Sequence, residues 1–146
     1  MGDHGPVPRP ERPLPPDLLL PLSTIGSFPK SERLKRARAD QARGTLDAVA
    51  LHRIEQEETI ACIRMQGALG LDLLVDGEMY RGDMTTYFAE NLEGFRISGL
   101  VRSYGNRYYR KPVVVGEVRW QRPVTVDWFR FALEQTRHPV KAILTG

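Results

Sequence analysis

The stretch Leu71–Asp76, "LDLLVD", decides the fold that this sequence predicts, because it is an apolar run of strand length that stops at the dipeptide "GE". Three further runs of this kind occupy residues 21–25, 112–118 and 140–145. Segments with helical periodicity are interspersed among the four runs. Such alternation is typical of an α/β protein built around a parallel sheet. We therefore expect about four parallel strands with intervening helices.

Short polar residues precede each predicted helix, where a side-chain oxygen can accept hydrogen bonds from the first N–H groups. These predicted caps are Ser31, Thr45, Asp83 and Thr125. The helices that they begin are expected to end near Gly44, Gly70, Leu92 and Thr136, respectively. Gly70 is a particularly clear stop, because glycine readily adopts the left-handed conformation that closes a helix.

Composition limits the class of protein. A chain of 146 residues with 41% hydrophobic content is sized for one globular domain. Six of its eleven prolines precede Asp17, so residues 1–17 are predicted to form a flexible proline-rich tail. The 21 basic and 18 acidic residues nearly balance, and a net charge of +3 gives little reason to expect a nucleic-acid partner.

Cysteine content and hydropathy indicate the compartment. Cys62 is the sole cysteine, which excludes an internal disulfide and a cysteine-based metal cage and suits a cytoplasmic location. No apolar run approaches the roughly 20 residues of a membrane-spanning helix, so no membrane partner is expected.

The carboxyl ends of the predicted strands are the first place to look for a site, because ligands of parallel α/β folds bind there. Each end places a glycine beside a hydroxyl or a carboxylate: "STIGSFP", "VDGEMYRGDM", "VGEVRW" and "ILTG". Ser27 or Glu78 could there bind a carboxylate or an ammonium group. Alternatively, each end is simply a turn with a solvated side chain. Asp76 and Glu78 would repel each other as an acid/base pair unless a cation or a ligand ammonium lay between them.

The segment at 102–111, "RSYGNRYYRK", interleaves basic and aromatic residues. This pattern suits stacking and charge pairing with RNA or with a flat anionic cofactor. An irregular connection whose tyrosines pack against the protein explains it equally well. Sequence spacing leaves these alternatives open.

Taken in order, four segments resemble the C-terminal catalytic domain of cobalamin-independent methionine synthases, and most of all the short single-domain members of that family. The segments are "LSTIGSFPKS", "GLDLLVDGEMYRGDMTTYFAENLEGF", "VRSYGNRYYRKPVVVGEVRW" and "PVKAILTG", and they run from about Leu19 to Gly146. The resemblance implies a (β/α)8 TIM barrel that transfers a methyl group to homocysteine, with zinc activating the thiol.

The resemblance also assigns residues to two sites. It implies homocysteine binding by Ile25, Gly26, Ser27 and Glu78, and methyl-donor binding by Arg107 and Tyr108. The first three would hold the amino-acid carboxylate and Glu78 the amine. The donor would be a methyl-folate, or, as expected for the short members, a methylcorrinoid protein. The family's zinc ligands lie beyond the last matched segment, so zinc is expected for the complete enzyme, with no metal ligand and no catalytic residue in this chain.

Residues 18–146 are thus expected to be the N-terminal half of a methionine synthase-type TIM barrel, truncated after strand four. A chain of this kind would be a methyltransferase by family, yet inactive alone. It would require a C-terminal companion fragment or would associate as a homodimer. The alternative is a non-catalytic half-barrel module that binds an amino acid or a partner protein.

Overall fold

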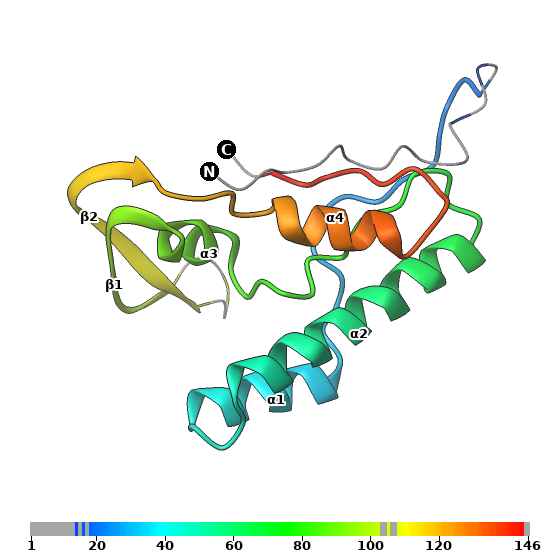
Figure 1. Ribbon diagram of the computed structural model, residues 1–146. Helices are drawn as coiled ribbons and strands as arrows, with labels where there is room; N and C mark the ends of the chain where they lie inside the picture. Colours follow the sequence, from blue (N-terminus) through cyan, green and yellow to red (C-terminus); the bar gives the residue numbers. More distant parts are fainter. Residues whose placement is uncertain (1–13, 15, 17, 103–104, 106–107, 145–146) are drawn as a thin grey trace. The chain divides into compact units, whose positions relative to one another are not determined.

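The computed structural model describes residues 14, 16, 18–102, 105 and 108–144 (Figure 1). The elements in chain order are α1 (Glu32–Ala42), α2 (Ala48–Ala68), α3 (Met84–Glu90), β1 (Leu92–Arg102), β2 (Tyr108–Trp120) and α4 (Val126–Glu134). The chain divides into a first unit, residues 1–80 with 128–144, and a second unit, residues 81–127 with 145–146. The predicted tail at 1–17 lies almost wholly outside the described residues.

Local capping confirms two predicted helix starts and corrects a third. Ser31 caps α1 by accepting a hydrogen bond from the N–H of Leu34, and Asp83 caps α3. The prediction for α2 was wrong, because its cap is Asp47, whose carboxylate accepts from Ala50. The Thr45 hydroxyl instead donates to the carbonyl oxygen of Asp40 at 3.0 Å, so it belongs to the turn that ends α1.

Other helix boundaries agree with the sequence to within a few residues. Gly70, with φ of +77°, follows the last turn of α2 as predicted, and α4 begins at Val126. None of the helices in the described ranges is long and apolar enough to cross a membrane.

The first unit buries two apolar clusters on α2. In one, Leu34 of α1 and Cys62 of α2 pack with Met79, and α1 lies alongside α2 (Figure 1). In the other, Ile63 packs with Leu74 and with Ala132 of α4. Helix α2 therefore packs against α1 and α4, and also against the residues on both sides of the turn after residue 75.

Three segments of the first unit lie side by side in parallel, joined by isolated bridges rather than by long strands. Ser23 bridges Leu73, and Leu74 bridges Val140. The segment around residue 74 is therefore in the middle. Residues 140 and 141 lie directly beside it on the side opposite the segment of Ser23.

The prediction of a parallel strand at Pro112–Val118 was wrong. These residues belong to β2, which pairs antiparallel with β1 in a two-stranded sheet of the second unit, from Leu92 opposite Trp120 to Arg102 opposite Tyr108. The turn around Gly105 leaves only a few residues between the strands. Local antiparallel pairing needs no more, whereas a parallel neighbour needs a crossover of a dozen residues or more. The segment "VGEVRW" consequently lies within β2 and is not the carboxyl end of a parallel strand.

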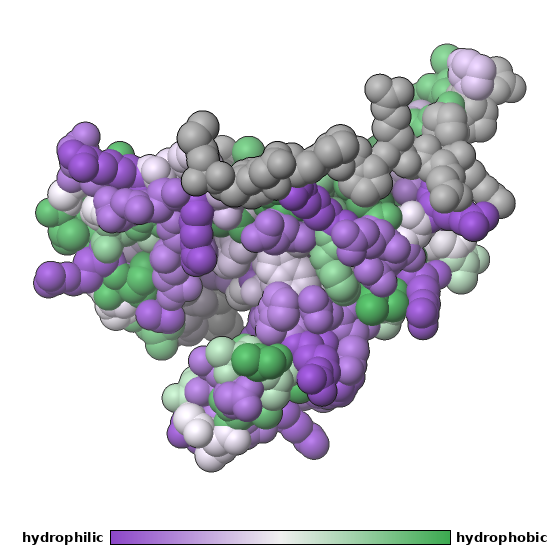
Figure 2. Space-filling model, viewed as in Figure 1, coloured by the Kyte–Doolittle hydropathy of each residue, from purple (hydrophilic) through white to green (hydrophobic). Residues whose placement is uncertain are grey.

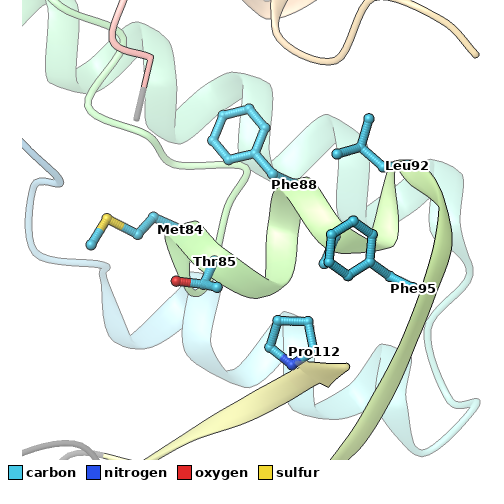
Figure 3. Close-up of a pocket in the computed structure, with 7 residues that line it drawn as sticks. Met84, Thr85, Phe88, Leu92, Phe95 and Pro112 are labelled. Carbon is cyan, nitrogen blue, oxygen red and sulfur yellow. The ribbon is translucent and has the colours of Figure 1, made fainter. Parts of the chain in front are cut away.

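Apolar side chains of the second unit are distributed between an exposed face and a pocket. Val114, Val115 and Trp120 of β2 are exposed, and Figure 2 shows apolar residues interspersed with charged ones over the hairpin. A pocket of about 250 Å³ lies between α3 and the hairpin (Figure 3). Its lining is mainly apolar: Met84, Thr85, Phe88, Ala89, Leu92, Phe95 and Pro112. No residue that the sequence assigned to a site contributes to it.

A glutamine side chain completes the hydrogen bonding of the middle segment. Gln66 is fully buried on α2; its Nε2 donates to the carbonyl oxygen of Val75 at 2.8 Å, and its Oε1 accepts from the N–H of Val75 at 3.0 Å. The side-chain amide thus makes the two hydrogen bonds that the backbone of a neighbouring strand would otherwise make with Val75. Unmade hydrogen bonds of buried backbone groups are costly, so this contact fixes where the segment ends.

We predict that Gln66→Leu lowers the free energy of unfolding by about 2 to 5 kcal/mol, because it leaves both backbone groups of Val75 without their partner. Urea denaturation measures the change. Gln56→Leu, on the same helix and partly exposed, is the matched control and should cost less than about 1 kcal/mol. Equal losses in the two variants would contradict this role of Gln66.

Candidate functional site

Hydrogen bonds connect two loops of the first unit, at residues 25–28 and 76–78. The N–H of Phe28 donates to the carbonyl oxygen of Gly77 at 3.1 Å. The Lys30 ammonium adds a second link, donating to the Ser27 hydroxyl at 2.6 Å, to the carbonyl of Phe28 at 3.0 Å and to that of Gly77 at 3.2 Å. The loop at 25–28 and the turn at 76–78 therefore form one edge of the unit.

The loop after the first parallel segment exposes its backbone. Gly26 has φ of +87°, and the side chain of Ile25 is 90% exposed. Within the described part of the chain, no atom accepts a hydrogen bond from the N–H groups of Ile25, Gly26 or Ser27. Lys141 holds the start of the loop by donating to the carbonyl oxygen of Thr24 at 2.8 Å. Successive N–H groups of this kind favour an anion.

The turn after the middle segment carries the carboxylates in different roles. Asp76 accepts hydrogen bonds from the N–H of Glu78 and from the hydroxyl of Tyr80, both at 2.9 Å. Glu78 is buried and has φ of +56°, an uncommon value for a residue with a side chain. Asp76 is thus engaged within the turn itself, which differs from an acid/base pair with Glu78. Asp76 shapes the turn, and Glu78 occupies its strained position.

Gly77, which lies between Asp76 and Glu78 in the sequence, packs tightly against Cys62. Its φ is +70°, and a Cβ atom added there would lie 2.5 Å from Sγ of Cys62. The turn can approach α2 this closely only because residue 77 has no side chain.

Buried charge surrounds the two loops. Arg38 of α1 donates to the carboxylate of Glu55 at 3.1 Å and to the carbonyl oxygen of Met79. Burial raises the pKa of Glu55, although Arg38 opposes the shift. Burial likewise raises the pKa of the Cys62 thiol to about 11.

The Lys30 ammonium is the group most affected by this environment. Burial and, to a smaller extent, the nearby Arg38 lower the pKa of Lys30, Glu78 and other acidic groups partly oppose the shift, and the resulting pKa is about 8. Lys30 therefore exchanges its proton close to neutral pH, unlike an ordinary lysine.

The structure brings Ile25, Gly26 and Ser27 to the same edge as Glu78 through the contacts of Phe28 and Lys30 with Gly77, and homocysteine binding by these residues stays a prediction. Tyr108 is the first residue of β2 in the second unit, where its side chain is 61% exposed. Arg107 lies outside the described residues. The flanking arginines are already engaged: Arg102 donates to the carbonyl oxygen of Gly105, and Arg110 pairs with Glu90 at 2.9 Å.

The described residues do not fit a zinc ion. Among them, no group of three or more histidine, cysteine, aspartate or glutamate side chains could hold a metal. The Cys62 thiol is buried and accepts a hydrogen bond from Gln66. His52 instead packs against the ring of Trp128, with 4.9 Å between centroids.

Sequence reasoning missed Lys30 and Gln66. Lys30 has a signal in "SFPKS", because it is the first charge after a strand end and lies three residues beyond Ser27. Gln66 has a weaker one, a polar residue on the apolar face of a helix. Its partner Val75 is nine positions away and is found only from the packing of α2.

These features define an α/β protein with a polar cradle beside its parallel segments, made of the loop at 25–28, which is exposed in part, and the buried turn at 76–78. Residues 20–146 match the family described as "Cobalamin-independent synthase, Catalytic domain". The chain is 45% identical over 128 residues to a 5-methyltetrahydropteroyltriglutamate–homocysteine methyltransferase of Mesorhizobium japonicum, covering 86% of this chain and 16% of that protein. A protein of the same name from Nitrobacter winogradskyi is 46% identical over 135 residues, covering 91% and 17%.

A solved B12-independent methionine synthase from a Shewanella species, in complex with selenomethionine, superposes with a TM-score of 0.65 at 26% identity. The match covers 83% of this chain and 36% of that one. The chain belongs to the cobalamin-independent methionine synthase family. It spans about a sixth of the length of the two curated relatives.

We predict that Lys30 makes stability rise with pH. Its folded pKa, about 8, lies below its usual value of 10.5, so between these values the unfolded chain binds more protons and the free energy of unfolding increases with pH. The raised pKa of Cys62 acts in the opposite direction between about pH 9 and 11. Urea denaturation of the wild type and of Lys30→Met across this range separates the two effects.

The stability of the wild type relative to Lys30→Met should increase by about 1 kcal/mol from pH 8 to 10, a figure reduced for solvent screening of a half-exposed group. A difference that stays constant with pH would contradict the lowered pKa of Lys30.

We also predict that Gly77→Ala lowers the free energy of unfolding by about 2 to 4 kcal/mol, from overpacking against Cys62 and from the left-handed backbone. Cys62→Ala in the same chain should recover part of this loss, because it removes the clashing sulfur. Gly82→Ala, whose Cβ would meet no atom within 4 Å, is the control. If the added Cys62→Ala brought no recovery, the contact between residues 77 and 62 would not be the cause.

Proposed function

We propose that this chain supplies the homocysteine-binding part of a methyltransferase that forms methionine. The observation that carries the proposal is the hydrogen bond from Phe28 to Gly77, together with the Lys30 links. These contacts put the anion-binding features of 25–27 at the same edge as the carboxylate residue Glu78. An amino acid has one carboxylate and one ammonium, and the cradle offers groups of complementary charge for both.

In this proposal the substrate carboxylate accepts hydrogen bonds from the Ser27 hydroxyl and from the N–H groups of residues 25–27. Glu78 receives the substrate ammonium. The positive φ of Glu78 supports this role, because strained backbone is retained mainly where function requires it. The complex of the Shewanella relative with selenomethionine, an amino acid of the same kind, supports it as well.

The names of the relatives favour a folate-type methyl donor, and Arg107 and Tyr108 remain the proposed contacts for it. A methylcorrinoid donor is the alternative. Because the described residues do not fit a zinc ion, thiol activation would require residues beyond them. Residues of this chain would accordingly bind and orient homocysteine, and methyl transfer would require a companion segment that supplies the zinc ligands.

Binding and activity test the proposal separately. Equilibrium dialysis with radiolabelled L-homocysteine or L-methionine measures whether the 146-residue chain binds the amino acid. Methyl transfer is then assayed for the chain alone and with the complementary C-terminal segment of a matched relative added. We expect binding in the first experiment and activity only with the added segment. Absence of binding would overturn the proposed substrate, and activity of the chain alone would overturn the need for a companion.

We predict that Glu78→Gln weakens amino-acid binding by about 1.5 to 3 kcal/mol, the range for a hydrogen bond to a charged group. The substitution keeps size and backbone and removes only the charge. Glu93→Gln, an exposed residue of β1, removes the same charge elsewhere and should leave the affinity unchanged. An unaltered dissociation constant for Glu78→Gln, with folding intact by circular dichroism, would show that residue 78 does not receive the ammonium.

A further inference from the structure

We propose that Lys30 is a positioning residue that directs the Ser27 hydroxyl toward the carboxylate of the amino-acid ligand and makes the site selective for ligands carrying that group. The inference rests on the proposed function, and it concerns a residue that the family resemblance does not assign.

The hydrogen-bond geometry at Ser27 supplies the first argument. The hydroxyl oxygen accepts from the Lys30 ammonium at 2.6 Å, so the hydroxyl proton points away from Lys30. Among the residues that the structure describes, the hydroxyl's one acceptor is the carbonyl oxygen of Phe28 at 3.4 Å, a long contact. A carboxylate oxygen is a much stronger acceptor. The ammonium also polarises the O–H bond, which strengthens its donation to an anion.

The charge of Lys30 supplies the second argument. Its three acceptors are a hydroxyl and two carbonyl oxygens, all neutral. Within the described ranges, no carboxylate forms an ion pair with Lys30. A carboxylate bound to Ser27 would lie within about 5 Å of the ammonium, counting two successive hydrogen bonds. Ligand binding would then bring a counter-charge to a half-buried cation that the protein leaves without a direct one.

The charged and titratable groups around Lys30 come from three elements and decide how it responds to pH. They are Arg38 of α1, Glu55 and Cys62 of α2, and Asp76 and Glu78 of the turn. Burial and Arg38 favour the neutral amine, and the acidic groups favour the ammonium, which places the pKa of Lys30 at about 8. A bound carboxylate favours the ammonium further. Carboxylate affinity should therefore be highest below about pH 8 and fall above it.

The test compares L-methionine with 3-(methylthio)propylamine, which has the same side chain and amine but no carboxylate. Dissociation constants are measured by calorimetry for the 146-residue chain and three variants: Lys30→Met, Lys30→Arg and the control Lys35→Met. Lys35 is an exposed α1 lysine paired with Glu32, so its loss removes equal charge from the same unit. Circular dichroism and urea denaturation establish that each variant is folded.

We expect Lys30→Met to weaken methionine binding about tenfold, equivalent to about 1.4 kcal/mol, while binding of the amine changes little. Lys30→Arg should restore most of the affinity and lose less of it than the wild type between about pH 7 and 9, because guanidinium remains charged while Lys30 loses its proton. The loss of the ligand's own ammonium proton at higher pH affects both chains equally. Lys35→Met should match the wild type.

The outcomes separate this inference from the proposed function. If the unaltered chain bound no methionine, both would fall. If it bound methionine but Lys30→Met weakened methionine and the amine equally, or weakened neither, the amino-acid site would stand and the role of Lys30 would be overturned. That role would also be overturned if Lys30→Arg bound methionine with the pH dependence of the wild type.

Discussion

The pairing of the Gln66 side chain with both backbone groups of Val75 is the contact on which the rest of the first unit depends. It satisfies both backbone groups of the last residue before the turn. The chain can then turn through Asp76 and Gly77. Gln66 also donates to the Sγ of Cys62, so the same side chain positions the wall against which Gly77 packs. An error in this pairing would displace the turn and Glu78 with it.

The cradle contains features that lower the free energy of unfolding as well as contacts that raise it. Glu78 holds a left-handed backbone, Gly77 sits against a sulfur with no room for a side chain, and Lys30 carries a charge that burial disfavours. Each of these features lowers the stability of the ligand-free chain. In the proposed function, the carboxylate of the ligand would offset the charge cost by bringing an opposite charge to Lys30. Strain and unfavourable charge at one edge of a well-packed unit are typical of binding sites rather than of structural turns.

The second unit follows simpler rules, since most of its structure is local. Asp83 caps α3 through two N–H groups, and the strands on either side of Gly105 pair as a hairpin. The Thr86 hydroxyl donates to the carbonyl oxygen of Arg110, which fixes α3 to β2. Residues 81–127 thus form a unit of their own, inserted in the sequence between parallel segments of the first unit. Val140, which follows them in the chain, forms a bridge with Leu74 of the middle segment.

The sequence by itself determined what depends on near neighbours. Caps at Ser31 and Asp83, the stop at Gly70, the α/β class and the polar residues after the apolar runs all follow from short-range chemistry. Family membership followed as well, because it rests on the order of whole segments. The sequence could not determine that residues 112–118 pair with β1, since an apolar run suits a parallel or an antiparallel neighbour equally. The cap at Asp47 is local as well, but Thr45 suits the same position on sequence grounds, and only the folded turn after α1 decides between them. The contacts of Gln66 with Val75 and of Lys30 with Gly77 join groups 9 and 47 positions apart, and only the tertiary structure brings them within hydrogen-bond distance.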